Sequence, residues 1–224
     1  MRPFIAIALV VLATAMTLGC GGSHQSRTTN AHAAPYAHAV NLRAAELPAS
    51  QWLAIGPESE AHVLPGGGIL SRCEGSRPET NATTRITSPL FRLKPDARRR
   101  TTPTGLQQAS AESTVYVMQN HALAEQDFTA ASECVARTGR GILFVSLHLF
   151  VPGAEVVGQR FRQPRLWSSK ARQHACRYTG TASSFVVGRA EIALHATGVA
   201  QPFPRVTEER LLSLLYRRAT AHRL

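Results

Sequence analysis

A side-chain alternation with a period of two marks one of the strands that we expect in this chain. Residues 112–119 (ESTVYVMQ) place Val115 and Val117 on one face and Tyr116 and Met118 on the other. A period of two is the side-chain repeat of a β-strand. The segment is therefore predicted to be a strand with apolar groups on both faces.

Two further segments show strand patterns. Residues 83–93 (TTRITSPLFRL) predict a strand that Pro89 restricts to an edge or a bulge, because proline cannot donate to a sheet ladder. Residues 141–151 (GILFVSLHLFV) are the most strand-like run of the chain. His148 lies within this run and is expected to be a hydrogen-bonded strand residue without a catalytic partner.

Residues 183–197 (SSFVVGRAEIALHAT) predict another strand, with one side exposed to solvent. One of its faces is apolar and the other carries ionisable groups. The apolar set is Ala190, Ile192, Leu194 and Ala196, and the second set is Arg189, Glu191, Ala193 and His195.

Two segments have helical periodicity. Residues 121–138 repeat apolar positions every three or four residues, and Gly139 supplies a stop. Residues 207–221 predict a final helix with Thr207 as N-cap, because acidic residues follow at the positive end of the helix dipole and arginines lie at the negative end. The buried stripe of this last helix is predicted to be Leu211, Leu212, Leu214, Leu215 and Ala219.

Strands joined by hairpins, with helices between them and at the end, predict an α+β fold in which helices cover an antiparallel sheet. The chain has 224 residues, which is enough for one well-buried domain and a tether. We expect this single domain to span residues 40–224.

The first residues have the features of an export signal. Arg2 precedes an apolar stretch from Phe4 to Met16, which is too short to span a bilayer since that needs roughly 20 apolar residues. The sequence TLGC that ends at Cys20 then resembles the lipobox of bacterial lipoproteins, although Thr17 occupies a position where that family usually has Leu, Val or Ile. The resemblance implies removal of residues 1–19 and a diacylglycerol on Cys20. The alternative is an ordinary secretory peptide cut elsewhere.

Residues 20–39 are small, polar and without a period. They predict a lipidated flexible tether that holds the domain away from the membrane. The implied location is the outer face of the cell membrane, after secretion through the signal peptide. Two acyl chains suffice for stable attachment at about 0.8 kcal/mol per buried methylene.

Four cysteines are present, and acylation of Cys20 would leave three in an oxidising compartment. We expect a Cys73–Cys134 disulfide, because Cys73 lies where a first helix should end and Cys134 lies on the inner side of a predicted helix. Closing the loop of roughly 60 residues would contribute about 4 kcal/mol in the chain-entropy model. Cys176 is then a free thiol. The weaker alternative is a zinc site, but no CxxC or HxxxH spacing supports one, so no metal is predicted.

The formal net charge is +11 at pH 7, and arginine supplies most of it. A GC-rich genome is one explanation, and contact with polyanions such as lipid headgroups or envelope polymers is the other. The segment 156–190 holds basic residues and no acidic one. It is either a polyanion contact or a long solvated hairpin excursion. The candidate contact residues are Arg160, Arg162, Arg165, Lys170 and Arg172. No nucleic acid partner is expected, because no basic platform interleaved with aromatic residues is evident.

Several of these features together resemble a known group of proteins. They are the lipobox, the spacer, the two cysteines around the first helices, the strand GRAEIALHATG and the closing PFPRVTEERLLSLLYRRA. They resemble exported lipoproteins of high-GC Gram-positive bacteria, which are similar to the extracytoplasmic sensor domains of mycobacterial serine/threonine kinases and to PsbP-like α/β/α sandwiches. The resemblance is clearest after Phe185 and absent in 159–177. It implies a fold and a location but no catalytic residues.

Three functions remain open from the sequence. The leading hypothesis is a non-enzymatic binding or sensing module of the cell envelope, with no cofactor and with an envelope protein, lipid or anionic polymer as partner. An envelope hydrolase is the rival, although Asp96 and Asp127 are the only aspartates and no GxSxG, SxxK or HExxH motif occurs. The third is a purely electrostatic binder of anionic lipid or wall polymer, which salt would weaken.

Overall fold

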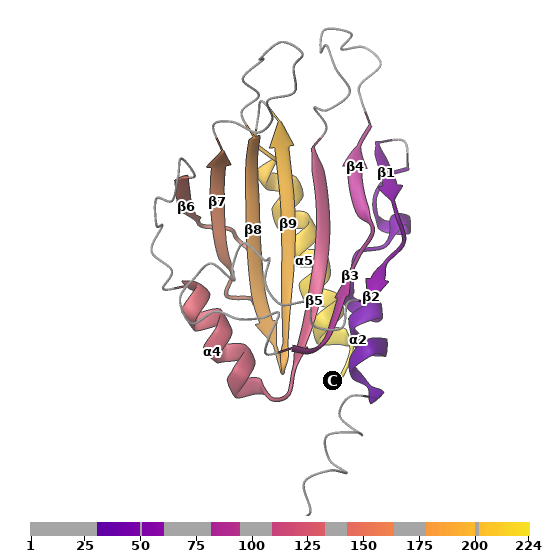
Figure 1. The fold of residues 1–224 in the computed structure, drawn as a ribbon, viewed down its shortest axis with the longest axis vertical. Helices are drawn as coiled ribbons and strands as arrows, with labels where there is room; N and C mark the ends of the chain where they lie inside the picture. Colours follow the sequence, from indigo (N-terminus) through magenta and orange to yellow (C-terminus); the bar gives the residue numbers. More distant parts are fainter. Residues whose placement is uncertain are drawn as a thin grey trace, which may run out of the picture.

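An antiparallel sheet of nine strands runs through the part of the chain that the computed structural model describes (Figure 1). That part comprises residues 31–49, 51–60, 82–94, 109–132, 143–163, 178–199 and 202–224. The strand order is β1-β4-β5-β9-β8-β7-β6, and β3 pairs with both β2 and β5. The predicted α+β fold, an antiparallel sheet covered by helices, is confirmed.

The strands and helices have the following bounds. The strands are β1 Trp52–Ile55, β2 Ser59–Glu60, β3 Ala82–Thr87, β4 Leu90–Leu93, β5 Ser110–Met118, β6 Leu143–Leu147, β7 Val157–Gln163, β8 Tyr178–Val187 and β9 Ala190–Val199. The helices are α2 Ala33–Val40, the short 3-10 helix η1 Ala44–Glu46, α4 His121–Ser132 and α5 Arg205–Ala221. None of the described helices is both long and apolar enough to cross a membrane.

The longest pairing in the sheet is the β8–β9 hairpin, which joins Tyr178 opposite Val199 to Val187 opposite Ala190. Its turn contains Gly188 with φ of +59°, a conformation that glycine adopts without a steric penalty. The sequence predicted a strand across 183–197, but this glycine divides the segment into the ends of two strands. The backbone hence reverses where the sequence pattern seemed continuous.

Pro89 has a similar effect on the segment 83–93. The structure divides it into β3 and β4, which pair with successive parts of β5: Thr87 lies opposite Thr114, and Phe91 opposite Ala111. Ser88, between the two strands, still donates its N–H to the carbonyl of Ser113. Proline, which has no N–H, therefore falls where the pairing is interrupted.

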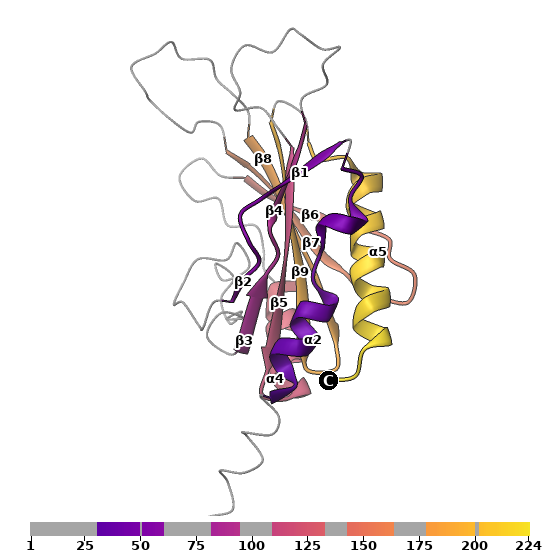
Figure 2. The ribbon, with the colours of Figure 1, turned by 90° about the vertical axis from the view of Figure 1, so that its right-hand side faces the viewer.

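Helices α2 and α5 cover one face of the sheet, as Figure 2 shows from the side. The main hydrophobic core lies between this face and the two helices. The sheet contributes the predicted apolar set of β9 and the odd positions of β5, and α5 contributes its predicted leucine stripe. Among the core residues are Val115, Val117, Ile192, Leu194, Leu211, Leu212 and Leu215.

Helix α4 packs on the opposite face of the sheet. Ala124 of α4 joins a cluster with Tyr116, Met118 and Ala193, and Ala131 packs against Ala182. Burial on this face contradicts the expectation that β9 has a solvent-exposed side, since Glu191 and Ala193 are each only 1% exposed. The second face of β9 is thus buried at Glu191 and Ala193, whereas His195 on the same face is half-buried.

The N-terminal boundary also differs from the sequence prediction. Residues 20–39 were expected to be a tether, but α2 begins at Ala33. Ala33, Tyr36, Ala37 and Val40 are buried in the main core. Their spacing of three and four residues places them on one side of the helix. The folded domain hence begins before residue 40, and the predicted boundary at 39/40 is wrong.

The two ends of the basic segment 156–190 are strands of the sheet, which contradicts a solvated excursion for those parts. β7 pairs with β8 from Val157 opposite Ser184 to Gln163 opposite Tyr178. The strand predicted over 141–151 is shorter than expected, because β6 ends at Leu147. His148 follows it as an exposed residue, so its expected place inside a strand is wrong.

Candidate functional site

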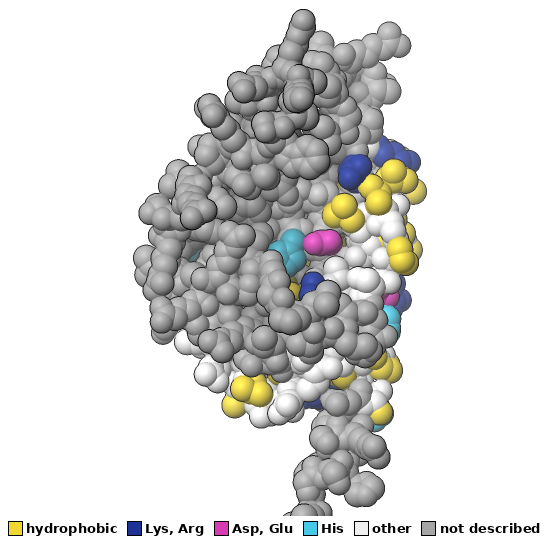
Figure 3. All heavy atoms as spheres, in the orientation of Figure 1, with side chains coloured by type: hydrophobic (Ala, Val, Ile, Leu, Met, Phe, Trp, Pro, Cys, Tyr) yellow, Lys and Arg dark blue, Asp and Glu magenta, His cyan; other side chains and the backbone are white. Residues whose placement is uncertain are grey.

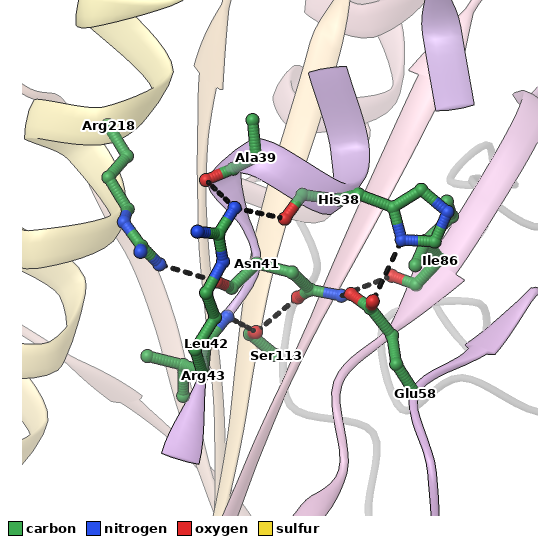
Figure 4. Close-up of polar contacts among 9 residues, drawn as sticks. All are labelled: His38, Ala39, Asn41, Leu42, Arg43, Glu58, Ile86, Ser113 and Arg218. Atoms are coloured by element: carbon green, nitrogen blue, oxygen red, sulfur yellow. Dashed lines mark hydrogen bonds and ion pairs between the residues drawn. The ribbon is translucent and has the colours of Figure 1, made fainter. Parts of the chain in front are cut away.

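A chain of hydrogen bonds leads from the surface to the sheet on the α2 side (Figure 4). Nδ1 of His38 lies 2.8 Å from Oε2 of Glu58, and the amide of Asn41 donates to Oε1 of Glu58 at 3.0 Å. The same amide donates to the carbonyl oxygen of Ile86 at 3.2 Å. The hydroxyl of Ser113 donates to the side-chain oxygen of Asn41. Serine, acid and histidine thus share one network.

The order of the hydrogen bonds in this network excludes Ser113 as an activated nucleophile. The Ser113 hydroxyl gives its proton to an amide oxygen, which is not a base, and its own oxygen accepts the N–H of Leu42 at 3.0 Å. Ser113 is fully buried. A nucleophile needs a base within reach and access for a substrate. The network therefore fixes the turn after α2 against β5, and its role is structural.

Arg218 of α5 contacts the same turn from the other side. Its Nη1 donates to the carbonyl oxygen of Asn41 at 2.5 Å and to Oε2 of Glu46 at 3.0 Å. A second guanidinium nitrogen of Arg218 forms an ion pair with Glu46. A cation beside the last carbonyls of a helix satisfies groups that lack intrahelical partners. α2, η1 and α5 are therefore held together by one arginine.

A second polar group lies between α5 and the sheet. The Ser183 hydroxyl donates to Oε1 of Glu208 at 2.8 Å, and both residues are buried. Burial raises the pKa of Glu208, against the hydrogen bonds of Ser183 and Thr181 and the charge of Arg160, which lower it. The Thr181 hydroxyl has no hydrogen-bond partner among the described residues, so Ser183 supplies the hydrogen bond to this carboxyl group. The Ser183–Glu208 pair therefore joins β8 to α5 inside the protein.

Arg160 was predicted to contact polyanions from a loop. It lies in β7, opposite Val145 and Thr181, and it is half-buried with its Nε inaccessible to solvent. Its charge acts on Glu208 beneath α5. Arg160 is thus part of the sheet, and it does not belong to a solvated basic loop.

Three ionisable residues form what we call the central polar cluster: Arg85, Glu112 and His195. They lie on the α4 face of the sheet, in β3, β5 and β9, and all three are half-buried. Glu112 and His195 are direct cross-strand partners. Directly opposite side chains on one sheet face lie about 4.5–5.5 Å apart at Cβ. The two groups are therefore neighbours in the middle of the sheet.

The charges of the central polar cluster influence one another. Burial raises the pKa of Glu112, and the charge of Arg85 opposes this shift. Burial lowers the pKa of His195 to about 4, and Arg85 adds to this effect. His195 is therefore a neutral imidazole at pH 7. Such perturbed groups gathered on one face are a feature of functional sites.

Two hydroxyl groups and an aromatic ring complete the surroundings of this cluster. The hydroxyls of Thr87 and Thr114 are 3.1 Å apart on paired strands. The guanidinium of Arg85 lies 5.8 Å from the centre of the Tyr116 ring. Figure 3 shows this face of the molecule, with a histidine beside an acidic side chain and a basic side chain below them. The arrangement offers a cation, a carboxyl group and neutral hydrogen-bonding groups.

Most of the predicted site residues lie outside the described residues. These are Cys20, Cys73, Cys134, Arg165, Lys170 and Arg172, and the thiol of Cys176. Arg162 lies in β7, where its backbone pairs with Leu143 and Thr179. Among the described residues, no three His, Cys, Asp or Glu side chains lie close enough together to hold a metal ion.

The sequence did not single out the central polar cluster. Glu112 was recognised only as the first residue of a strand, and His195 only as part of a face expected to be wet. Charged residues at alternate positions of two predicted strands were the available signal. Pairing β5 with β9 is what brings Glu112 opposite His195, and one sequence does not reveal which strands pair.

Comparison with known proteins gives little beyond the fold. No family model matches the chain, and no curated protein does. Among solved structures, the extracellular domain of PknH from Mycobacterium tuberculosis is similar at 10% sequence identity and a TM-score of 0.48. The alignment covers 84% of this chain and 96% of that domain. A likeness of this size transfers neither a function nor residue roles.

Proposed function

We propose that this chain is a non-enzymatic binding or sensing module of the cell envelope, anchored to the outer face of the cell membrane by a diacylglycerol on Cys20. The observation that carries the binding role is the central polar cluster. Arg85, Glu112 and His195 occupy the middle strands of the sheet, where apolar side chains would pack more favourably. A ligand that matches these groups would offset the unfavourable burial.

The anchoring part of the proposal is supported by the sequence. An apolar stretch follows Arg2, and Cys20 follows it directly after a small residue, as in a lipobox. Helix α2 begins at Ala33, which leaves residues 21–32 between the acylated cysteine and the first described helix. Even fully extended, such a segment spans only about 40 Å. The domain would consequently work close to the bilayer.

The non-enzymatic part is supported by the chemistry of the two sites. Ser113 donates its proton to Asn41 and is not activated. In the central polar cluster, neither a hydrogen bond nor an ion pair joins Glu112 to His195 among the described contacts. A general base must instead lie within about 2.6–3.2 Å of its partner. Binding is the role that this spacing supports.

The anchor is tested by replacing Cys20 with Ala. The wild-type protein should partition into the detergent phase and carry a diacylglycerol mass on its N-terminal cysteine. Cys20→Ala should remain uncleaved or be shed without an acyl chain, and Cys176→Ala should behave as wild type. An unmodified mature N-terminus at another residue, found by mass spectrometry, would refute lipidation.

The binding role is tested with the full chain in neutral detergent micelles. Fractionated envelope lipids, sugars and soluble anions are added while the melting temperature is followed. A compound that raises the melting temperature of the wild-type protein should have no such effect on Glu112→Ala. Glu155→Ala removes an exposed carboxylate elsewhere and serves as control. Equal responses of both variants to every compound would contradict a site at Glu112.

A further inference from the structure

The guanidinium of Arg85 is not fully satisfied by the described residues. Its Nε is buried and has no hydrogen-bond partner. No hydrogen bond or ion pair of Arg85 occurs among the described contacts. The face of Tyr116 lies 5.8 Å from its guanidinium, and the carboxyl group of Glu112 is close enough for the charge of Arg85 to act on it. A buried donor without a partner destabilises a protein by about 1–3 kcal/mol, and more when the group is charged.

Three other described arginines have a hydrogen-bond or ion-pair partner for their guanidinium group. Arg189 donates to the carbonyl of Met118 at 2.7 Å, and Arg218 pairs with Glu46. Arg205 pairs with Glu209 at 2.9 Å. Arg160 also has an unbonded Nε, but the carboxyl of Glu208 lies near enough for their charges to interact in the core. Arg85 shares this feature, since its charge likewise acts on the carboxyl group of Glu112. Arg160 lies beneath α5, whereas Arg85 lies on the α4 face with the other groups of the central polar cluster. Among the described arginines, Arg85 is therefore the candidate for a ligand on that face.

The surroundings of Arg85 indicate what kind of group that is. A guanidinium binds carboxylate and phosphate oxygens through a planar fork of N–H donors. The hydroxyls of Thr87 and Thr114, on the same sheet face, bond each other, which leaves one O–H of the pair as a further neutral donor. His195 is uncharged at neutral pH and can donate one ring N–H. The Arg85 surroundings thus provide donors for an oxyanion, with Glu112 at the other end of the cluster.

We propose that Arg85 binds an oxyanion group, a carboxylate or a phosphate, of the ligand that this face receives, with His195 and the Thr87–Thr114 hydroxyls as neighbouring donors. This inference rests on the proposed binding function and specifies the chemistry of its ligand. The ligand satisfies the Nε–H of Arg85, for which the described residues offer no hydrogen-bond partner. A phosphate of a soluble molecule and a phosphate of a lipid headgroup present the same chemistry to Arg85.

The experiment follows the Nε–H signal of Arg85 in a ¹H–¹⁵N spectrum of the full chain in neutral detergent micelles. Inorganic phosphate and acetate are the soluble probes, and micelles doped with phosphatidylglycerol are the lipid probe. Saturable movement of the Arg85 signal is the expected result. Movement with free phosphate or acetate assigns a soluble ligand, whereas movement with doped micelles alone assigns a lipid headgroup.

Two variants of Arg85 separate a binding role from a structural one. Arg85→Gln should weaken oxyanion binding by at least about tenfold, as expected for loss of a charged hydrogen bond. Arg85→Met keeps the length of the side chain without its donors, and it should leave the melting temperature unchanged or raise it in the absence of ligand. If Arg85 had a structural role, Arg85→Met would instead lower the melting temperature. Arg210→Gln removes the same charge from an exposed position on α5 and should bind as wild type.

The outcomes distinguish this inference from the proposed function. Equal weakening in Arg85→Gln and Arg210→Gln would mean that the anions respond to net charge, and it would overturn the inference. An Arg85 signal unmoved by phosphate, acetate and doped micelles would also overturn it. If an uncharged sugar or a cation then shifts the signals of Glu112 and His195, the binding function stands with a different ligand. No shift on this face with any probe would contradict both.

Discussion

The hydroxyl of Ser183 lies 2.8 Å from Oε1 of Glu208 and donates a hydrogen bond to it, which joins β8 to α5. Glu208 is 1% exposed and Ser183 is fully buried. A carboxyl group at the centre of a helix–sheet interface is costly when ionised. Its raised pKa is the consequence, since burial outweighs the hydrogen bonds and the charge of Arg160.

This relationship predicts a pH dependence of stability. The folded protein holds the Glu208 proton more tightly than the unfolded chain does, because the folded pKa is raised above the ordinary value of 4.5. The stabilisation is therefore fully present below pH 4.5 and is lost as the pH rises through the folded pKa. Glu208→Gln should raise the free energy of unfolding at pH 8 and flatten its dependence on pH. Urea denaturation at several pH values measures both.

Glu209 is the matched control for that prediction. The N–H of Phe150 and the side chain of Arg205 lower its pKa. Its contribution to stability has the opposite sign, being present above the unfolded pKa and lost as the pH falls through the folded one. Glu209→Gln should not raise stability at pH 8. A rise as large as that of Glu208→Gln would contradict the role of burial.

Asn41 is predicted to be the most sensitive position of the α2 network. Its amide bonds Glu58 and the carbonyl of Ile86, and its oxygen accepts from Ser113. Asn41→Ala leaves buried groups unsatisfied and should lower the free energy of unfolding by about 2–3 kcal/mol. Chemical denaturation provides the measurement. Ser213→Ala, which loses only a bond within α5, should change stability by less than about 0.5 kcal/mol.

Arg218 should not be replaceable by lysine. Its guanidinium reaches the carbonyl of Asn41 and the carboxylate of Glu46 at once. A lysine ammonium lacks this planar fork, so Arg218→Lys should lower the free energy of unfolding by about 1–2 kcal/mol. Arg217→Lys, at an exposed position of the same helix, should be neutral. A double-mutant cycle with Glu46→Gln measures the coupling, and a coupling near zero would refute the bridge.

His195 should stay neutral far below its ordinary titration range. Its pKa is lowered to about 4, first by burial and then by the charge of Arg85. Because the unfolded chain binds this proton near pH 6.5 and the folded protein does not, stability is lost as the pH falls from 6.5 toward 4. The imidazole signals of His195 in NMR spectra should not move between pH 8 and pH 5.5. A titration midpoint of His195 near pH 6.5 would instead show an open, solvated side chain and would contradict the prediction.

The cysteine prediction remains to be tested, because Cys73, Cys134 and Cys176 lie outside the described residues. We expect Cys73 and Cys134 to be bridged and Cys176 to be free. Peptide mapping under non-reducing conditions should recover the Cys73–Cys134 pair, and reduction should lower the melting temperature. Recovery of Cys176 in an intramolecular disulfide would refute the assignment.

Strand β5 and helix α5 were predictable from the sequence because their local pattern and their tertiary burial agree. The alternation of Val115 and Val117 with Tyr116 and Met118 divides them between the two cores of the structure. The helix likewise buries Leu211, Leu212, Leu215 and Ala219. It begins at Arg205, however, and Thr207 lies inside its first turn instead of capping it. Helix ends depend on the preceding chain direction, which the period does not encode.

Two predictions were wrong for the same physical reason: segments distant in sequence pack against residues that the sequence pattern suggested were exposed. The second face of β9 looked wet because Glu191 and His195 alternate with Ala193, but α4 packs over that face. Residues 33–40 looked like spacer because alanine is small and the stretch is short. Ala33 and Ala37 are nevertheless buried against the sheet. Alanine serves at such close approaches, and composition alone does not show it.

The central polar cluster was beyond single-sequence reasoning for a similar reason. Arg85, Glu112 and His195 come from three strands, and their proximity follows from the order β3, β5, β9 in the sheet. Strand order is set by the whole chain, since a strand can pair with any other of suitable length. The charged residues were visible in the sequence, but their grouping was not.

The contact between α2 and α5 has a consequence for biogenesis. The hydroxyl of Tyr36 donates to the carbonyl of Ala219 at 3.4 Å, across 183 residues of sequence, and both helices belong to one core. That core remains open until the final helix has been synthesised, and contacts so distant in sequence form late. A nascent chain of this protein therefore lacks this part of its core until α5 has been synthesised. For the export that we propose, this delay would favour the unfolded state that a channel for unfolded polypeptide requires.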